Sequence, residues 1–211
     1  MKILCAHHKG GVGKTAAAIH ATGVLNGEGE RVLLIDADSQ NDSYRFFSKG
    51  DSPTRPGDEL EVDDLLTVVS ARAEDLDALV RRPGFDHVVV DVKPDLREIT
   101  PVLVAAAPDL ALVGVRKDDY GSFTHLDDML EALRQARSLG VRPRIKVVPI
   151  GVEEAEFAEY VDAPDIAYEV ADPILWRPTE AGTGMYRAYE YLWEYDGCGD
   201  AYAQYQSVVL D

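Results

Sequence analysis

An apolar run at residues 3–6 leads into the stretch Lys9-Gly10-Gly11-Val12-Gly13-Lys14-Thr15, and an alanine-rich segment follows. A small-residue loop between a strand and a helix lets backbone N–H groups surround phosphate oxygens, at the positive end of the helix. In such a loop Lys14 neutralises phosphate charge and the Thr15 hydroxyl binds Mg²⁺. The stretch therefore predicts a phosphate-binding P-loop. The alternative interpretation is a glycine-rich turn flanked by surface lysines.

The loop departs from the usual P-loop at its start, where His8 stands in place of the first glycine and Lys9 follows. The pattern Lys-Gly-Gly-x-Gly-Lys-Thr resembles the deviant Walker A motif of the ParA/MinD family of ATPases. This resemblance implies ATP and Mg²⁺ as ligands, with Lys9 reaching across a dimer interface to the partner's nucleotide and Lys14 acting within its own subunit. The residues that it implies for nucleotide binding are Gly10, Gly11, Val12, Gly13, Lys14, Thr15 and Ala16.

Length and composition predict one soluble domain over residues 1–211. The chain is 46% hydrophobic and 28% charged, which is ordinary for a globular protein. No apolar run approaches the ~20 residues that cross a bilayer, and the first residues lack the pattern of a signal peptide, so we expect a cytoplasmic protein. Cys5 and Cys198 offer neither a disulfide framework nor metal-ligand spacing, and Cys5 is expected in the core.

The formal net charge is −17. Proteins bind DNA nonspecifically by neutralising phosphates with Lys and Arg, so this charge weakens any DNA binding unless the basic residues share one face. Adaptation to a salt-rich cytoplasm is an equally good explanation of the acidic composition. The densest basic cluster contains Arg134, Arg137, Arg142, Arg144 and Lys146. It is either a nucleic-acid-binding patch or a set of cations that complements a helix C-terminus, and the sequence modestly favours the second interpretation.

Continuous apolar runs alternate with helical patterns along the chain. Strands are expected at residues 2–7, 31–36, 86–91, 110–115 and 144–150, because such runs suit strands buried on both faces. Helices are expected at 15–25, 73–82, 96–107 and from about residue 123 to Gly140. Residues 65–69 fit a strand or the start of a helix. Residues 39–63 predict a short helical piece and then a polar loop, either a disordered insertion or a nucleotide-responsive surface. The alternation predicts an α/β fold with a doubly wound, mostly parallel sheet.

Three carboxylates stand at the ends of predicted strands, where ligands bind in open α/β sheets. The segment Asp36-Ala37-Asp38-Ser39-Gln40 is similar to the family's second motif, with Ser39 where proline is usual. The resemblance implies that Asp38 orients the attacking water and that Asp36 assists around Mg²⁺. Asp91 ends the next apolar strand in the Walker B arrangement and is expected to hold Mg²⁺ together with Thr15. Asp91-Val92-Lys93-Pro94-Asp95 also resembles the family's switch segment. Alone, each acidic stretch would be an ordinary strand end.

The last third of the chain carries a weaker signal. Residues 173–178 resemble the segment that closes over the base in the family, without assignable residues. Six tyrosines follow between Tyr186 and Tyr205. A tyrosine-rich tail resembles the bacterial tyrosine kinases, but those lack the Lys9 arrangement, so we expect packing or interface residues. The last residues lack the basic amphipathic helix of MinD-type membrane binding, and the cysteines do not suit the family's iron-sulfur carriers.

The resemblance therefore implies a ParA-type ATPase that forms a homodimer with Mg-ATP and hydrolyses it slowly. It implies action in plasmid or chromosome partitioning, stimulated by a ParB-like or other partner protein, at the nucleoid if nonspecific DNA is bound. One alternative is a relative that positions a protein cargo without binding DNA. Another is a nucleotide-binding module without turnover.

Overall fold

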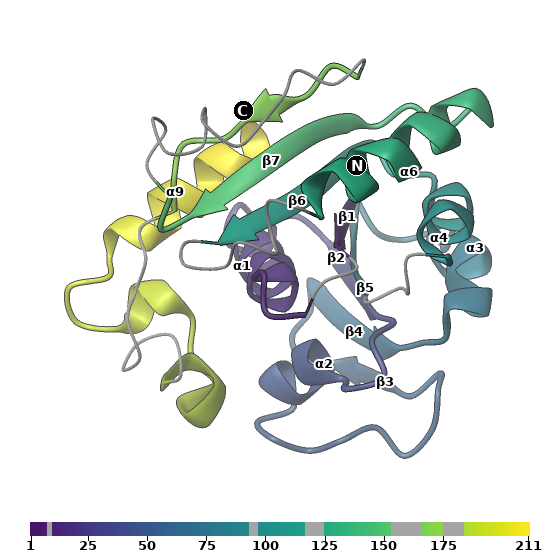
Figure 1. Ribbon diagram of the computed structural model, residues 1–211. Helices are drawn as coiled ribbons and strands as arrows, with labels where there is room; N and C mark the ends of the chain where they lie inside the picture. The colour runs from purple at the N-terminus through teal and green to yellow at the C-terminus, as the bar shows by residue number, and fades with distance from the viewer. Residues whose placement is uncertain (8–9, 93–96, 117–124, 153–165, 175–183) are drawn as a thin grey trace.

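The computed structural model describes residues 1–7, 10–92, 97–116, 125–152, 166–174 and 184–211. The strands in these ranges form one sheet of eight strands, in the order β3-β4-β2-β5-β1-β6-β7-β8 (Figure 1). Neighbouring strands are parallel except β3 and β4. The strands are β1 (Lys2–Ala6), β2 (Val32–Asp36), β3 (Glu59–Glu61), β4 (Leu66–Ser70), β5 (His87–Val92), β6 (Leu110–Arg116), β7 (Arg144–Ile150) and β8 (Glu169–Val170). The helical segments are α1 (Lys14–Gly27), α2 (Asp42–Phe47), η1 (Ala73–Asp75), α3 (Leu76–Leu79), α4 (Ile99–Ala106), α6 (Leu126–Ser138), η2 (Met185–Tyr189), η3 (Leu192–Glu194) and α9 (Asp200–Leu210).

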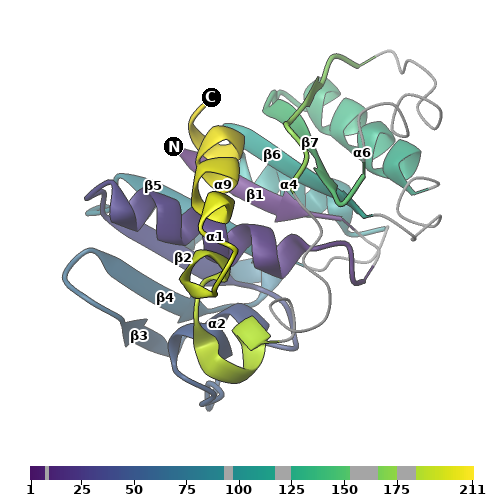
Figure 2. The same ribbon diagram turned by 90° about the vertical axis from the view of Figure 1, so that its left-hand side faces the viewer.

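Helices cover both faces of the sheet, so its central strands are apolar on both sides. Along β1, Ile3 and Cys5 point into one core, and Leu4 and Ala6 point into the other. The first core lies under α1, α2 and α9, and the second under α3, α4 and α6 (Figure 1). Seen from the side, α9 lies against α1 (Figure 2). This two-sided burial explains why the strands read as continuous apolar runs.

The structure confirms the doubly wound α/β fold and the five strands expected from apolar runs. Residues 65–69 are a strand, β4, and the predicted helical piece after Asp38 is α2. The helix expected at 73–82 is shorter, because it starts with the 3₁₀ turn η1 and is α-helical only in α3. The antiparallel edge strand β3 was not predicted, since Glu59-Leu60-Glu61 is short and largely exposed. Within the described ranges, no helix has the length and apolar character needed to span a bilayer.

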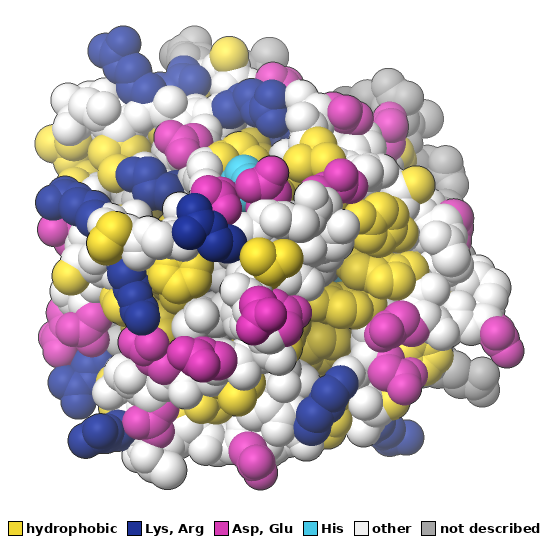
Figure 3. All heavy atoms as spheres, turned by 180° about the vertical axis from the view of Figure 1, so that it is seen from behind, with side chains coloured by type: hydrophobic (Ala, Val, Ile, Leu, Met, Phe, Trp, Pro, Cys, Tyr) yellow, Lys and Arg dark blue, Asp and Glu magenta, His cyan; other side chains and the backbone are white. Residues whose placement is uncertain are grey.

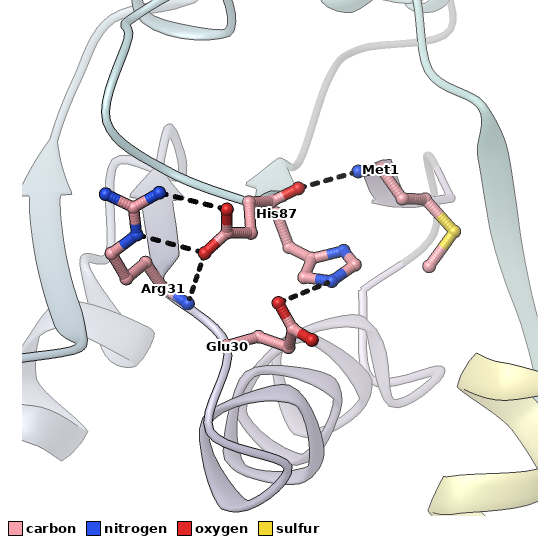
Figure 4. Close-up of polar contacts among 5 residues, drawn as sticks. Met1, Glu30, Arg31 and His87 are labelled. Atoms are coloured by element: carbon pink, nitrogen blue, oxygen red, sulfur yellow. Dashed lines mark hydrogen bonds and ion pairs between the residues drawn. The ribbon is translucent and has the colours of Figure 1, made fainter.

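A polar cluster ties the amino ends of three strands together (Figure 4). The P-loop follows the opposite, carboxyl end of β1. Arg31 and Asp86 precede β2 and β5, and the Arg31 guanidinium donates to both Asp86 carboxylate oxygens at 3.0 and 3.1 Å. The Met1 amino group donates to the Asp86 carbonyl at 2.9 Å. The side-chain and backbone hydrogen bonds from Arg31 hold the pKa of Asp86 down to about 2. The cluster aligns β1, β2 and β5, whose opposite ends carry the residues of the candidate site.

Candidate nucleotide-binding site

The described part of the loop after β1 ends in a left-handed glycine directly before α1. Gly13 has φ +91°, in the left-handed region that favours glycine, and it precedes the first residue of α1. A Cβ at Gly13 would also lie 2.4 Å from the Ile150 side chain. Lys14 is buried at the start of α1. His8 and Lys9 lie outside the described residues, so the trans-acting role of Lys9 stays a prediction.

A second glycine, Gly114 on β6, allows the loop to pack closely on the sheet. A Cβ at Gly114 would lie 2.5 Å from the carbonyl oxygen of Val12, a backbone atom that cannot rotate away. Val12 itself is fully buried, so it contributes its backbone to the loop and its side chain to the interior. Sequence reasoning missed Gly114, because its constraint comes from a residue about a hundred positions earlier.

The loop opens into a cavity of about 370 Å³. Its polar side is formed by the P-loop, the segment after β2 and the end of β6, namely Gly10, Gly11, Gly13, Lys14, Thr15, Ala16, Asp38, Gln40, Asp42 and Arg116. Its other side is largely apolar and is formed by Ile150, Ile174, Met185, Tyr186, Leu192 and Tyr205. A cavity with one polar, glycine-lined side that carries Lys14 and Arg116 and one apolar, aromatic side suits a nucleotide, whose phosphates and base differ in the same way.

The carboxyl ends of three neighbouring strands meet beside this loop. β1 lies between β5 and β6, and the Asp36 and Asp91 Cα positions are paired in the β2–β5 register. Asp36 is fully buried and accepts the backbone N–H groups of Asp38 at 3.1 Å and Tyr44 at 2.8 Å. Asp38 lies on the cavity wall and accepts the Gln40 N–H at 3.0 Å. The predicted carboxylates are thus brought together at one edge of the sheet.

Burial and repulsion between neighbouring carboxylates make the two inner carboxylates, Asp36 and Asp91, hard to ionise. Burial raises the pKa of Asp91 to about 7, the charge of Asp36 adds to this rise, and the hydroxyls of Thr15 and Ser43 oppose it. Burial likewise raises the pKa of Asp36 to about 6, while the backbone N–H of Tyr44 and the nearby Ser43 hydroxyl act to lower it. A cation at this position would relieve the repulsion.

The residues present fit a magnesium ion. Asp91 Oδ1 is buried and has no hydrogen-bond partner among the described residues, and the Thr15 hydroxyl lies close enough to lower the pKa of Asp91. Carboxylate and hydroxyl oxygens are ligands that Mg²⁺ accepts. Within the part of the chain that the structure describes, no group of three or more acidic, His or Cys side chains forms a metal cage. That suits Mg²⁺, which usually keeps waters and phosphate oxygens as its other ligands.

Residues 185–205 supply most of the apolar wall of the cavity, whereas the sequence pointed only to residues 173–178, of which Ile174 lines the cavity. His20 of α1 is fully buried, its Nδ1 lies 2.6 Å from the Ala16 carbonyl, and its Nε2 accepts the Leu192 N–H at 3.0 Å. The ring also stacks on Tyr205, with centroids 4.3 Å apart. Tyr191 stacks on Trp193 in the same cluster. The expectation of packing roles is confirmed for Tyr191 and Tyr205, whereas residues 175–183 lie outside the described ranges.

The predicted basic cluster divides between the two faces of the sheet. Arg144 and Lys146 of β7 donate to the carbonyls of Asp211 and Ser207 at the end of α9, at 2.9 and 3.3 Å. Arg134 on α6, which covers the opposite face, pairs with Glu131. Figure 3 shows Lys and Arg side chains standing among Asp and Glu side chains on the face seen from behind. The arrangement favours the helix-terminus interpretation, although the helix that Arg144 and Lys146 complement is α9.

The fold and the site define a P-loop nucleotide-binding protein with a doubly wound sheet. Residues 3–177 match the CobQ/CobB/MinD/ParA nucleotide binding domain family, and the chain belongs to this family. The chain is 32% identical over 170 residues to the chromosome-partitioning ATPase Soj of Thermus thermophilus, covering 71% of this chain and 67% of Soj.

Solved structures share the fold at lower sequence identity. An ATP complex of Cyanothece McdA superposes with a TM-score of 0.78 at 19% identity, covering 98% of this chain and 94% of that one. A plasmid partition protein of Borrelia burgdorferi bound to AMPPNP has a TM-score of 0.72 at 18% identity, covering 99% and 96% of the two chains. Of the switch segment expected at residues 91–95, residues 93–95 lie outside the described ranges.

Proposed function

We propose that this protein is a Mg-ATP-dependent, dimerising ATPase of the ParA type, which acts in the cytoplasm in the partitioning of a plasmid or chromosome. The observation that carries the proposal is that Lys14, Thr15 and Asp38 line one cavity, beside the left-handed Gly13, while the buried Asp91 lies within reach of the Thr15 hydroxyl. Phosphoryl transfer needs positioning and charge neutralisation rather than covalent chemistry, and this edge supplies both.

In this proposal each group has a separate task. Lys14 and the first N–H groups of α1 hold the phosphates, and Lys9 reaches the nucleotide of the second subunit. Thr15 and Asp91 hold Mg²⁺, with Asp36 beside them, and the ion neutralises charge that develops on the phosphate oxygens. Asp38, on the cavity wall, orients the water that attacks the terminal phosphate. A partner protein accelerates this slow step.

A second candidate is a ParA-like ATPase that positions a protein cargo without binding DNA. The net charge of −17 and the division of the basic cluster between two faces favour it. Both features weaken the counterion release on which nonspecific DNA binding depends.

Binding of the Asp38→Ala variant to nonspecific duplex DNA tests the choice between these candidates. The variant is measured with Mg-ATP and with Mg-ADP, across a salt titration, and its mass in ATP is recorded in parallel. DNA binding that requires ATP and weakens with salt supports the partition ATPase. A dimer that binds no DNA at any salt concentration supports protein-cargo positioning. A phosphate-release assay on the wild type separates both from a nucleotide-binding module without turnover.

A further inference from the structure

Ser43 lies between the two inner carboxylates of the site. It is the second residue of α2 and is fully buried. Its hydroxyl donates to Asp91 Oδ2 at 3.1 Å. Asp36, which is paired with Asp91 across the β2–β5 register, is also close enough for this hydroxyl to act on it. A serine hydroxyl has one hydrogen, so it donates to one carboxylate at a time, and here that carboxylate is Asp91.

The two carboxylates differ in what fixes their orientation. Both oxygens of Asp36 accept backbone N–H groups, from Asp38 and Tyr44, so Asp36 is held without Ser43. Asp91 Oδ2 accepts the Ser43 hydroxyl, whereas Asp91 Oδ1 is buried and has no hydrogen-bond partner among the described residues, although the Thr15 hydroxyl lies nearby. The terminal torsion of an aspartate is broad, so a single donor can decide which oxygen is held and which is left for another ligand.

We propose that Ser43 is a positioning residue for the magnesium site: it holds Asp91 Oδ2 and thereby presents Oδ1 to the cation. The inference rests on the proposed function, because it concerns the metal that accompanies the nucleotide. Outer partners that orient a ligating carboxylate contribute strongly to metal affinity. Ser43 therefore sets how much Mg²⁺ the protein requires to bind ATP, while the glycine loop and Lys14 bind the phosphates independently of it.

The test compares ATP binding by the wild type and the Ser43→Ala variant, with a fluorescent ATP analogue, in a Mg²⁺ titration and in EDTA. Loss of a hydrogen bond to a charged group weakens an interaction by about tenfold or more. We expect the Mg²⁺ concentration for half-maximal tight binding to rise about tenfold, and the affinity in EDTA to stay within about twofold of the wild type. A merely structural role would weaken binding equally in both conditions.

Ser70→Ala is the matched control. Ser70 is also buried, at the end of β4, and its hydroxyl donates to Asn41 Oδ1 at 2.9 Å in the same loop region. Like Ser43→Ala, the Ser70→Ala substitution removes a hydroxyl oxygen from a buried serine. We expect it to leave the Mg²⁺ requirement for ATP binding unchanged. If Ser43→Ala does not fold, Ser43→Cys keeps the volume with a weaker donor and should raise the Mg²⁺ requirement by a smaller factor.

Two outcomes overturn the inference: a wild-type Mg²⁺ requirement in the folded Ser43 variant, or an equal loss of affinity with Mg²⁺ and in EDTA. Failure of the wild type to bind the ATP analogue in any condition would instead refute the proposed function. The two failures are therefore distinguishable in one set of titrations.

Discussion

Lowering the pH from about 7.5 to about 5 should destabilise this protein through one buried side chain, His20. The ring is enclosed by α1, η3 and α9, and its two nitrogens are engaged with Ala16 and Leu192. Burial lowers its pKa from 6.5 to about 4. Between these two values the unfolded chain binds a proton that the folded protein does not. The stability that neutral His20 contributes is thus present above pH 6.5 and is lost as the pH falls toward 4.

The size of this loss follows from the two pKa values. A full shift from 6.5 to 4 corresponds to about 3.4 kcal/mol, of which about 2 kcal/mol is lost between pH 7.5 and pH 5. Asp36 and Asp91 change the free energy of unfolding in the opposite direction. Their raised pKa values let the folded state bind protons at a higher pH than the unfolded chain, so they stabilise the folded state as the pH falls. The total pH dependence therefore mixes the two effects, and a variant is needed to isolate His20.

Urea unfolding of the wild type and of His20→Gln at both pH values provides the measurement. The free energy of unfolding should fall between pH 7.5 and 5 by about 2 kcal/mol more in the wild type than in the variant. Any constant destabilisation by the substitution cancels in this comparison. Equal changes in the two proteins would refute the assignment of His20 as a neutral buried link between α1 and the C-terminal segment.

Four substitutions test the loop and its neighbours. Lys14→Ala should lower ATP affinity by about 100-fold, measured by isothermal titration, and unchanged affinity would contradict its phosphate role. Lys9→Gln should spare ATP binding but abolish the ATP-dependent dimer, so a dimer mass in light scattering would count against a trans-acting lysine. Asp38→Ala should retain the ATP-bound dimer while phosphate release falls at least about 100-fold, and retained turnover would assign the water to another group. Gly114→Ala should cost about 1–3 kcal/mol in thermal unfolding and weaken ATP binding, because its Cβ would displace the Val12 carbonyl; wild-type values for both would show that the loop tolerates the shift.

The parts of the fold that were predictable are those encoded locally. Each central strand is an apolar run bounded by turns, and the P-loop carries its lysine, threonine and glycines within seven residues. Asp36 and Asp91 were also predictable, because parallel strands end at the same edge of a sheet. In each case the chemistry and the spacing lie within one short stretch.

The parts that were missed depend on contacts between distant segments. Gly114 is constrained by the backbone at Val12, and Ser43 has a role only because α2 brings it under Asp91. His20 is one of several polar residues in the alanine-rich α1, and the sequence does not reveal that it accepts the N–H of the distant Leu192. No local pattern carries such information, because each requirement arises from how the chain packs rather than from its neighbours in sequence.

The apolar wall of the cavity has a consequence for how the chain is made. Gly10 is synthesised well before Met185, Leu192 and Tyr205, and all four line the same cavity. A nascent chain that carries the finished P-loop still lacks most of the apolar side of the cavity. The cavity is therefore complete only in a chain whose synthesis has passed Tyr205.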